Sequence, residues 1–353
     1  MASGYVSYSP SSHFNFQIGH GKHFVGDGYR SLLLSDNAFN YPYLRITSSF
    51  QKFQYTNIYT VFMNLNDGGV VTPAYTERLF QKKVGSFQYL NYTPNKKIQF
   101  GVFQGMIWEA TDNRNKTNIN ANYFNPLLFV NIPIYGLNNK NNILLGATFK
   151  FKPKPVILIY AQALVDDIKT DNTKHTFPKQ GYQVGARFQN LFKVKDLTLQ
   201  LEHNQVFPYT YSSTLVAQNY AHYNQALAHP LGANFREEIA FINYHKYGLF
   251  AELKLTYALI GADAVGQNYG NNIFSSDASA AYTNLPANGV GQGIRTTIVY
   301  QDFKLGYLVN PATNFNIILG VINRLKQDIN SKQQSSFIYF GIKTALTNAY
   351  FDF

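Results

Sequence analysis

The stretch "LFAELKLTY", residues 249–257, decides the fold. In it, Leu249, Ala251, Leu253, Leu255 and Tyr257 alternate with Phe250, Glu252, Lys254 and Thr256. A period of two places the two sets on opposite faces of a β-strand. The same alternation recurs over 182–189 and 197–202, and no segment carries a convincing 3.6-residue stripe. We therefore predict an all-β protein whose helices are few and short.

The amino-acid composition indicates whether such strands would lie in water or in a membrane. Of 353 residues, 16% are aromatic and only 14% are charged, against roughly 25% charged residues in ordinary soluble domains. No apolar run is long enough for a transmembrane helix. Alternating strands of this kind are typical of membrane β-barrels, which are apolar outside and polar inside. We expect Leu197, Leu199, Leu201, Leu249, Leu253 and Leu255 to face lipid, and Arg187, Gln200, Glu202, Glu252 and Lys254 to face the lumen.

Two classes of connection alternate along the chain from residue 43. Short turns fall near 93–96, 152–155, 191–195, 245–246 and 310–313, and long polar segments near 20–42, 65–82, 107–141, 165–180, 205–234, 259–290 and 325–334. Outer-membrane barrels have short periplasmic turns and long external loops, whereas a soluble β-sandwich or barrel, the runner-up, would not sort its loops by length. We predict an antiparallel transmembrane β-barrel of about 14–18 strands in the cell outer membrane.

The number of expected strands bears on whether residues 1–353 contain the whole barrel. Strands expected near residues 4, 13, 43, 53, 83, 97, 142, 156, 181, 196, 235, 247, 291, 314 and 335 make fifteen, whereas single-chain bacterial barrels usually have an even number. No signal-peptide pattern follows Met1. We expect 1–353 to form one barrel domain that is shortened at its N-terminus, without its signal peptide and some strands.

The chain ends "TNAYFDF", and a terminal Phe on an alternating strand resembles the assembly signal of bacterial outer-membrane proteins. The alternation moves from even to odd positions near 344–348. A bulge there, or the end of the last strand, is expected.

The glycine-rich stretch "GHGKHFVGDGYRSLLLSDN", residues 19–37, admits three interpretations. A phosphate loop requires a helix after the glycines and has no support here. A metal site built on His20 and His23, with His13 or Asp27, has too few ligands, and the absence of cysteine excludes Cys-based zinc or redox sites. A loop over the outer rim remains, with Tyr29 and residues 32–34 folded back into the barrel mouth.

Three stretches carry a family resemblance. "FQIGHGKHFVGDGYRSLLLSDNA" (16–38), "LEHNQVFPYTYS" (201–212) and "NYAHYNQALAHPLGANFREE" (219–238) resemble the Wzi-type capsule assembly proteins, and more closely the gliding-motility RemB-like branch. The resemblance implies an outer-membrane barrel, of 18 strands in the capsule protein, that acts in surface attachment of polysaccharide or in surface motility. It does not imply catalysis.

Two external loops hold the candidate ligand-binding residues. The first offers Arg30, Ser31, Asp36 and Asn37, and the second offers Tyr209, Tyr211, Tyr220, His222, Tyr223, Asn224, His229 and Arg236. Tyrosine rings stack on sugars, and arginine pairs with the carboxylates of acidic polysaccharides. The alternative is that the second loop packs on itself and closes the barrel mouth.

Other activities lack residues to carry them. Glu237–Glu238 and Asp166–Asp167 are adjacent, so within a strand each pair would point to opposite faces, and no nucleophilic-serine motif is present. No cofactor or metal is expected. The net charge of +11 is scattered, which argues against nucleic acid. Paired lysines at 96–97, 152 with 154, and 193 with 195 are either solvated turn charge or contacts for anionic lipid or a periplasmic protein.

The sequence therefore favours a non-enzymatic outer-membrane barrel that attaches or assembles capsular or extracellular polysaccharide. Its expected partners are that polysaccharide, outer-membrane lipid including lipopolysaccharide, and other outer-membrane or periplasmic proteins. One alternative is a structural subunit of a gliding-motility or protein-secretion apparatus. A passive porin is a weaker one.

Overall fold

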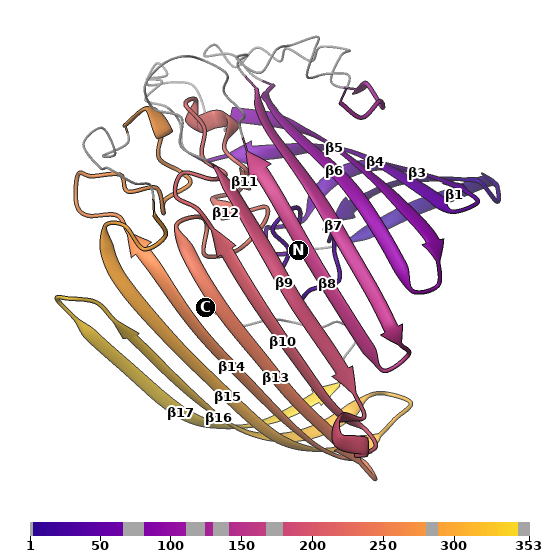
Figure 1. Cartoon of the computed structure of the whole chain (residues 1–353), viewed down its shortest axis with the longest axis vertical. Coiled ribbons are helices and arrows are strands. Elements are labelled where there is room, and N and C mark those ends of the chain that lie inside the picture. The colour runs from indigo at the N-terminus through magenta and orange to yellow at the C-terminus, as the bar shows by residue number, and fades with distance from the viewer. Residues whose placement is uncertain are drawn as a thin grey trace, which may run out of the picture.

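Fifteen strands form one antiparallel sheet in which every strand pairs with its neighbours in the chain (Figure 1). The computed structural model describes residues 3–65, 81–110, 124–129, 141–166, 179–279 and 289–344. A separate small hairpin, β11 (Ala221–His222) with β12 (Gln225–Ala226), lies in a connecting loop. In the part of the chain that the structure describes, no helix has the length and apolar character needed to cross a membrane. The all-β prediction is confirmed.

The sheet is built from β1 (Gly4–Ser11), β2 (Phe14–Gly21), β3 (Tyr41–Phe50), β4 (Phe53–Asn64), β5 (Gln81–Asn95), β6 (Ile98–Glu109), β7 (Asn142–Lys154), β8 (Ile157–Asp166), β9 (Gln180–Gln189), β10 (Leu197–Val206), β13 (Phe235–Lys246), β14 (Leu249–Ala262), β15 (Ile294–Asn310), β16 (Phe315–Gln327) and β17 (Lys332–Thr344). Each of the fifteen predicted strands is present close to its predicted start.

Connections are sorted by length between the two ends of the sheet. Turns at 12–13, 51–52, 96–97, 155–156, 190–196, 247–248 and 311–314 lie at one end, the short-turn rim. The strand ends that flank the segments 22–40, 65–80, 110–141, 167–179, 207–234 and 263–293 lie at the other, the long-loop rim. The predicted alternation is thus confirmed for these connections. The predicted lysines Lys96, Lys97, Lys193 and Lys195 are exposed in two of the short turns.

The long loop predicted at 325–334 is wrong. β16 and β17 are joined there by the tight turn 328–331, in which Asp328 Oδ1 accepts the backbone N–H groups of Asn330 and Ser331 at 2.7 Å each. The polar residues that suggested a loop are the ends of two long strands. Apart from Thr344, the last residue of β17, the predicted bulge at 344–348 and the terminal Phe lie outside the described residues.

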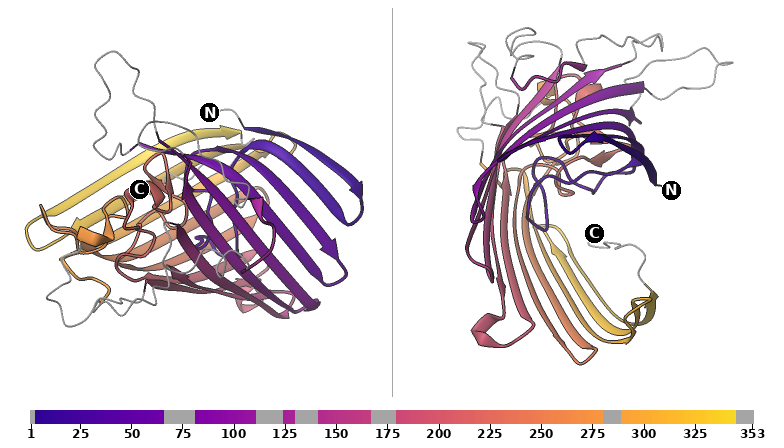
Figure 2. Two further views of the ribbon diagram at one scale, coloured as in Figure 1. Left: turned by 90° about the horizontal axis from the view of Figure 1, so that it is seen from above. Right: turned by 90° about the vertical axis from the view of Figure 1, so that its right-hand side faces the viewer.

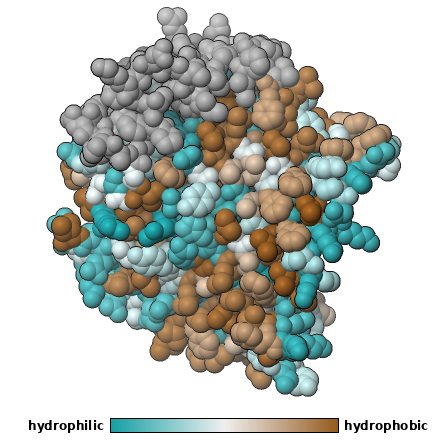
Figure 3. Space-filling model, viewed as in Figure 1, coloured by the Kyte–Doolittle hydropathy of each residue, from teal (hydrophilic) through white to brown (hydrophobic). Residues whose placement is uncertain are grey.

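The sheet has one apolar and one polar face, as predicted. Leu201, Leu249 and Leu255 are exposed on the outer face, while Glu202 and Lys254 are buried on the inner face. Register places Leu197, Leu199 and Leu253 with the first set, and Arg187, Gln200 and Glu252 with the second. Apolar side chains gather on the outer surface over the lower parts of β10 and β13 (Figure 3). Since the apolar side of a membrane barrel faces lipid, this face is the lipid-facing wall.

The sheet curves around a central space, and β1 and β17 are its edges. Figure 2 shows the edge strands facing each other across a gap, and within the described residues they do not pair with each other. The curvature follows from the regular twist between neighbouring strands. That further strands complete the barrel stays a prediction.

The central space holds the hydrophobic core. Leu32, Leu33 and Leu34 are fully buried and belong to a cluster on the inner face. The same cluster includes Phe62, Phe87, Phe103, Leu144 and Leu164 from the strands, and Tyr211, Tyr220 and Leu227 from the connection 207–234. Two segments of the long-loop rim therefore fold into the space enclosed by the sheet.

Candidate functional site

Residues 22–40, the inserted loop, connect β2 to β3 and cross the inside of the sheet to β8, β9 and β10. The loop closes on itself through the Val25 N–H, which donates to Leu34 O at 2.8 Å. Two glycines permit its path. Gly26 has a φ of +125°, which side chains rarely adopt, and a Cβ on Gly28 would lie 2.7 Å from Glu202 Oε2. The glycines therefore allow the backbone of the inserted loop to approach the wall closely.

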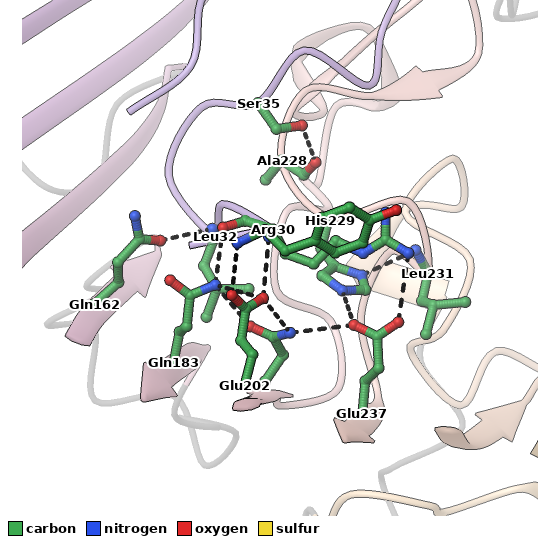
Figure 4. A network of polar contacts seen from close by, with 12 residues as sticks. Arg30, Leu32, Ser35, Gln162, Gln183, Glu202, Ala228, His229, Leu231 and Glu237 are labelled. Atoms are coloured by element: carbon green, nitrogen blue, oxygen red, sulfur yellow. Dashed lines mark hydrogen bonds and ion pairs between the residues drawn. The ribbon is translucent and has the colours of Figure 1, made fainter. Parts of the chain in front are cut away.

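Glu202 on β10 is the main anchor of the inserted loop (Figure 4). Its Oε2 accepts the Tyr29 N–H at 2.6 Å, and its Oε1 accepts the Arg30 N–H at 3.0 Å. Tyr160 donates its hydroxyl to Oε2 at 2.7 Å, so the carboxylate is bonded from the wall as well. A carboxylate on the inner face thus supplies the hydrogen-bond acceptors that this irregular backbone would otherwise lack.

Amide side chains of the wall hold the rest of the loop. Gln162 accepts the Leu32 N–H at 2.8 Å and donates to Val25 O at 2.8 Å, and Gln183 donates to Arg30 O at 2.9 Å. Such bonds span more than a hundred residues of sequence. The loop is therefore fastened to at least three strands through its main chain.

A second buried carboxylate, Glu237 on β13, joins the inserted loop to the connection 207–234. Its Oε1 lies 3.5 Å from the Arg30 guanidinium, and its Oε2 accepts His229 Nε2–H at 2.7 Å. His229 Nδ1 accepts the Leu231 N–H at 3.2 Å, which assigns the neutral tautomer. Burial, the largest influence, lowers the pKa of His229 and keeps it neutral.

The connection 207–234 forms a cap over the inserted loop. Tyr211 and Tyr220 are fully buried and donate their hydroxyls to Leu32 O at 2.7 Å and Leu33 O at 2.6 Å. Burial raises the pKa of both phenols well above the usual range. Tyr209 is also buried and donates to Asn268 O at 2.8 Å. These rings support backbone and do not line an open surface.

His222, on β11 of the cap, repeats the arrangement of His229. Its Nδ1 accepts the Met63 N–H at 3.0 Å, and its Nε2 lies 3.3 Å from Asn40 O, which it can reach only as a donor. Burial lowers the pKa of His222 to about 4. The imidazole is therefore neutral and ties the cap to both β4 and the inserted loop.

A cavity of about 940 Å³ lies between the inserted loop, the cap and the wall. Its lining includes Lys22, Phe24, Tyr29, Arg30, Asp36 and Asn37 from the inserted loop, Gln225 and Pro230 from the cap, and Arg187 and Gln200 from the wall. Three of these side chains are cationic and one is anionic. Phe24 is 38% exposed, so an aromatic ring is available beside the charges.

All predicted site residues except Arg236 divide into three groups. Arg30, Ser31, Asp36 and Asn37 line the cavity. Tyr209, Tyr211, Tyr220, His222 and His229 are buried in the cap and its contacts. Tyr223 and Asn224 lie at the tip of the β11–β12 hairpin, where Asn224 is exposed.

Arg236 lies apart from the other predicted site residues. Its neighbour Glu237 points inward, and strand alternation therefore turns Arg236 to the outer face, away from the cavity. Sequence reasoning missed Lys22 and Phe24, for which no pattern gave a signal. Arg187 and Gln200 were assigned to the lumen by alternation, but not to a site.

No group of three or more His, Asp or Glu side chains in the described ranges is placed to hold a metal ion. His23 instead lies against Tyr41, whose hydroxyl is 3.3 Å from its Nδ1. Burial, with a smaller effect from Arg45, lowers the pKa of His23 to about 4.

Comparison with solved structures finds the fold among outer-membrane proteins. The chain is similar to Wzi of Escherichia coli, described as an outer-membrane protein involved in group 1 capsule assembly and a carbohydrate-binding β-barrel. The TM-score is 0.61 at 14% identity, over 97% of this chain and 69% of Wzi. It also matches OprD of Pseudomonas aeruginosa with a TM-score of 0.48 at 9% identity, over 98% and 81% of the two chains.

No protein-family model matches the chain. No curated protein matches it either. The sheet, its apolar outer face and the likeness to Wzi define the class as an outer-membrane β-barrel protein. The predicted fold class and location are thereby confirmed.

Proposed function

We propose that this chain is a non-enzymatic outer-membrane barrel that holds an acidic extracellular polysaccharide at the cell surface. The cavity between inserted loop and cap carries the proposal. It combines an exposed aromatic ring, Phe24, with the cationic side chains of Lys22 and Arg187. Arg30 also lines the cavity, but it is buried and paired with Glu237. Aromatic faces pack on sugar rings, and guanidinium groups pair with carboxylates. The carbohydrate binding described for Wzi, a barrel of the same fold, adds support.

The filled interior argues against a passive porin. The inserted loop and the cap bury leucine and tyrosine side chains in the space that an open channel would need. Among the described contacts, none specifically favours a subunit of a gliding or secretion apparatus. That the gliding-motility branch is the nearest relative stays a prediction.

The test measures binding of a uronic-acid oligosaccharide, and of a neutral one of equal length, to the purified barrel in detergent. Arg187→Ala and Phe24→Ala should each weaken acidic-sugar binding at least about tenfold, a loss of about 1.4 kcal/mol. Phe192→Ala, at a short turn where Phe192 is 85% exposed, is the matched control and should bind normally. Equal binding by all variants, or ion conductance without binding, would contradict the proposal.

A further inference from the structure

The outer face of β4, β5 and β6 departs from the apolar wall around it. Asn57, Gln88 and Gln104 are paired across these strands, Asn57 with Gln88 and Gln88 with Gln104. The register continues to Leu145, Val165 and other lipid-facing positions, so the three amides are on the outer face. Uncovered amides in hydrocarbon are costly. Yet all three side chains are buried, with at most 4% exposed.

Residues 124–129, the outer strap, cover these amides. In Figure 1 the strap is the short magenta segment at the upper right, set between grey traces. The Phe129 N–H donates to Gln104 Oε1 at 2.8 Å, and Tyr59 donates its hydroxyl to Phe124 O at 3.1 Å. Tyr55 donates to Pro126 O. Gln104, Tyr55 and Tyr59 of the wall are therefore bonded to the backbone of the strap, whereas Asn57 Oδ1 is buried without a hydrogen-bond partner among the described residues.

The wall amides also bond among themselves beneath the strap. Gln104 donates to Gln88 Oε1 at 3.2 Å, and Gln88 donates to Ser86 Oγ at 2.6 Å. Phe129 has a φ of +64°, a conformation that costs energy for a residue with a side chain. In this conformation the Phe129 N–H donates its hydrogen bond to Gln104, so the strap is held in a defined shape.

The strap presents apolar side chains on its far side. Phe124 is 49% exposed, Leu127 58% and Phe129 43%. No residue of the strap is charged. Further along β6 the outer face continues with the exposed Phe100, which is paired with the exposed Phe149 of β7. The strap thus restores an apolar surface where the wall itself is polar.

We propose that Phe124, Leu127 and Phe129 of the outer strap contact the acyl chains of the surrounding bilayer. The strap is a membrane-facing patch that lets β4–β6 keep polar residues on their outer face. Continuity with the lipid-facing wall, and the absence of any charge in the strap, favour lipid over a protein partner, whose interfaces carry polar rims. The proposal rests on the barrel fold and not on polysaccharide binding.

The test uses single cysteines, which the native chain lacks, carrying a fluorophore in protein reconstituted into liposomes. Leu127→Cys is compared with Leu201→Cys on the bare outer wall and with Phe192→Cys on a short turn. We expect lipid-borne nitroxide to quench the Leu127 label about as strongly as the Leu201 label. Aqueous iodide should quench it several-fold less than the Phe192 label. All three variants must retain the heat-dependent gel mobility of folded barrels.

Two outcomes would overturn the proposal. Strong iodide quenching with weak lipid quenching would place the strap in water. Protection from both quenchers, with energy transfer between differently labelled molecules, would place it in an interface between two copies of the chain.

A second variant tests the anchors. Gln88→Leu with Gln104→Leu should raise iodide quenching at Leu127→Cys several-fold, because the strap loses the acceptor of its Phe129 N–H and the Gln88 donor to Asn125 O, and keeps only the two tyrosine hydroxyls. Gln301→Leu, at an exposed outer-face position of β15, is the matched control and should leave it unchanged. An unchanged label in the double variant would show that the amides do not hold the strap.

Discussion

The inserted loop and the outer strap are two irregular segments of the long-loop rim that fold against opposite faces of one sheet. Both are held by wall side chains that bond their backbones: Glu202 and Gln162 inside, Gln104 and Tyr59 outside. They differ in the charge of the anchors and in the fate of the apolar side chains. Inside, leucines are buried and a carboxylate is used; outside, apolar rings are exposed and the anchors are neutral.

The difference follows from what lies beyond each face. The lumen supplies the inner carboxylate with hydrogen-bond donors, the Tyr160 hydroxyl and the Asn204 amide, which offset part of the cost of burying its charge. Hydrocarbon offers no such donors, and a charge there costs much more than an amide that is already bonded. On both faces, side chains of the wall form the hydrogen bonds that an irregular backbone needs. A charged side chain takes part on the inside, and only neutral side chains do so on the outside.

Removal of the inner anchor should have the largest effect. Glu202→Ala removes the acceptor for two backbone N–H groups of the inserted loop. We expect a loss of at least about 3 kcal/mol of unfolding free energy, since each hydrogen bond to a charged group contributes about 1.5–3 kcal/mol. Urea unfolding in detergent, followed by the loss of heat-dependent gel mobility, measures it.

The matched control is Glu238→Ala, on the outer face of the neighbouring strand β13 and close to the long-loop rim, where β13 begins at Phe235. Glu238 pairs with His203 at 2.7 Å and its side chain is 50% exposed. Its removal should cost no more than about 1 kcal/mol. Equal effects of the two substitutions would break the distinction between the faces.

The outer anchor should matter less. Gln104→Ala leaves the Phe129 N–H without its acceptor, which costs about 1–3 kcal/mol when the group stays buried. The same urea titration checks this, with Gln301→Ala as the control. A loss larger than that of Glu202→Ala would reverse the proposed ranking of the two anchors.

The sheet was predictable because strand alternation and loop sorting are local in sequence. Leu249–Tyr257 and its counterparts predict the faces and the strand starts correctly. The folding back of Tyr29 and residues 32–34 was predicted and is confirmed, but the wall residues that hold them were not predictable, because the bonds join distant residues such as Tyr29 and Glu202. The outer strap was not predicted. One signal was available in the outer wall, where Gln88 and Gln104 interrupt apolar positions of their strands.

The candidate site was predictable only in part. Arg30, Ser31, Asp36 and Asn37 do line a cavity, since a polar loop at the rim is a reasonable place for binding. Composition could not separate Tyr223 from Tyr211 and Tyr220, although the last two are buried by packing of the cap on the inserted loop.

Acid should loosen the inner face alone. His222 has a pKa of about 4 in the docked cap, below its usual 6.5, so an undocked cap binds protons more readily. Docking should therefore weaken as pH falls from about 6.5 to about 4 and change no further below that. His229, whose pKa is also lowered, adds to the effect.

Hydrogen exchange at pH 7 and at pH 4.5, corrected for intrinsic rates, measures this. Protection should fall in 207–234 and stay constant in the outer strap, which contains no ionisable side chain. His222→Gln, which can keep both hydrogen bonds without titrating, should reduce the change. Equal loss of protection in the strap would show that acid acts on the whole sheet.

Disulfide trapping tests most directly that a loop from one edge of the sheet lies inside it against the cap. Ser35 donates its N–H to Leu227 O at 2.7 Å and its hydroxyl to Ala228 O. Ser35→Cys with Ala228→Cys should therefore cross-link upon mild oxidation of the folded protein in membranes. Ser35→Cys with Leu127→Cys, on opposite faces, should not. Failure of the first pair to cross-link, or efficient cross-linking of the second, would contradict this placement of the loop.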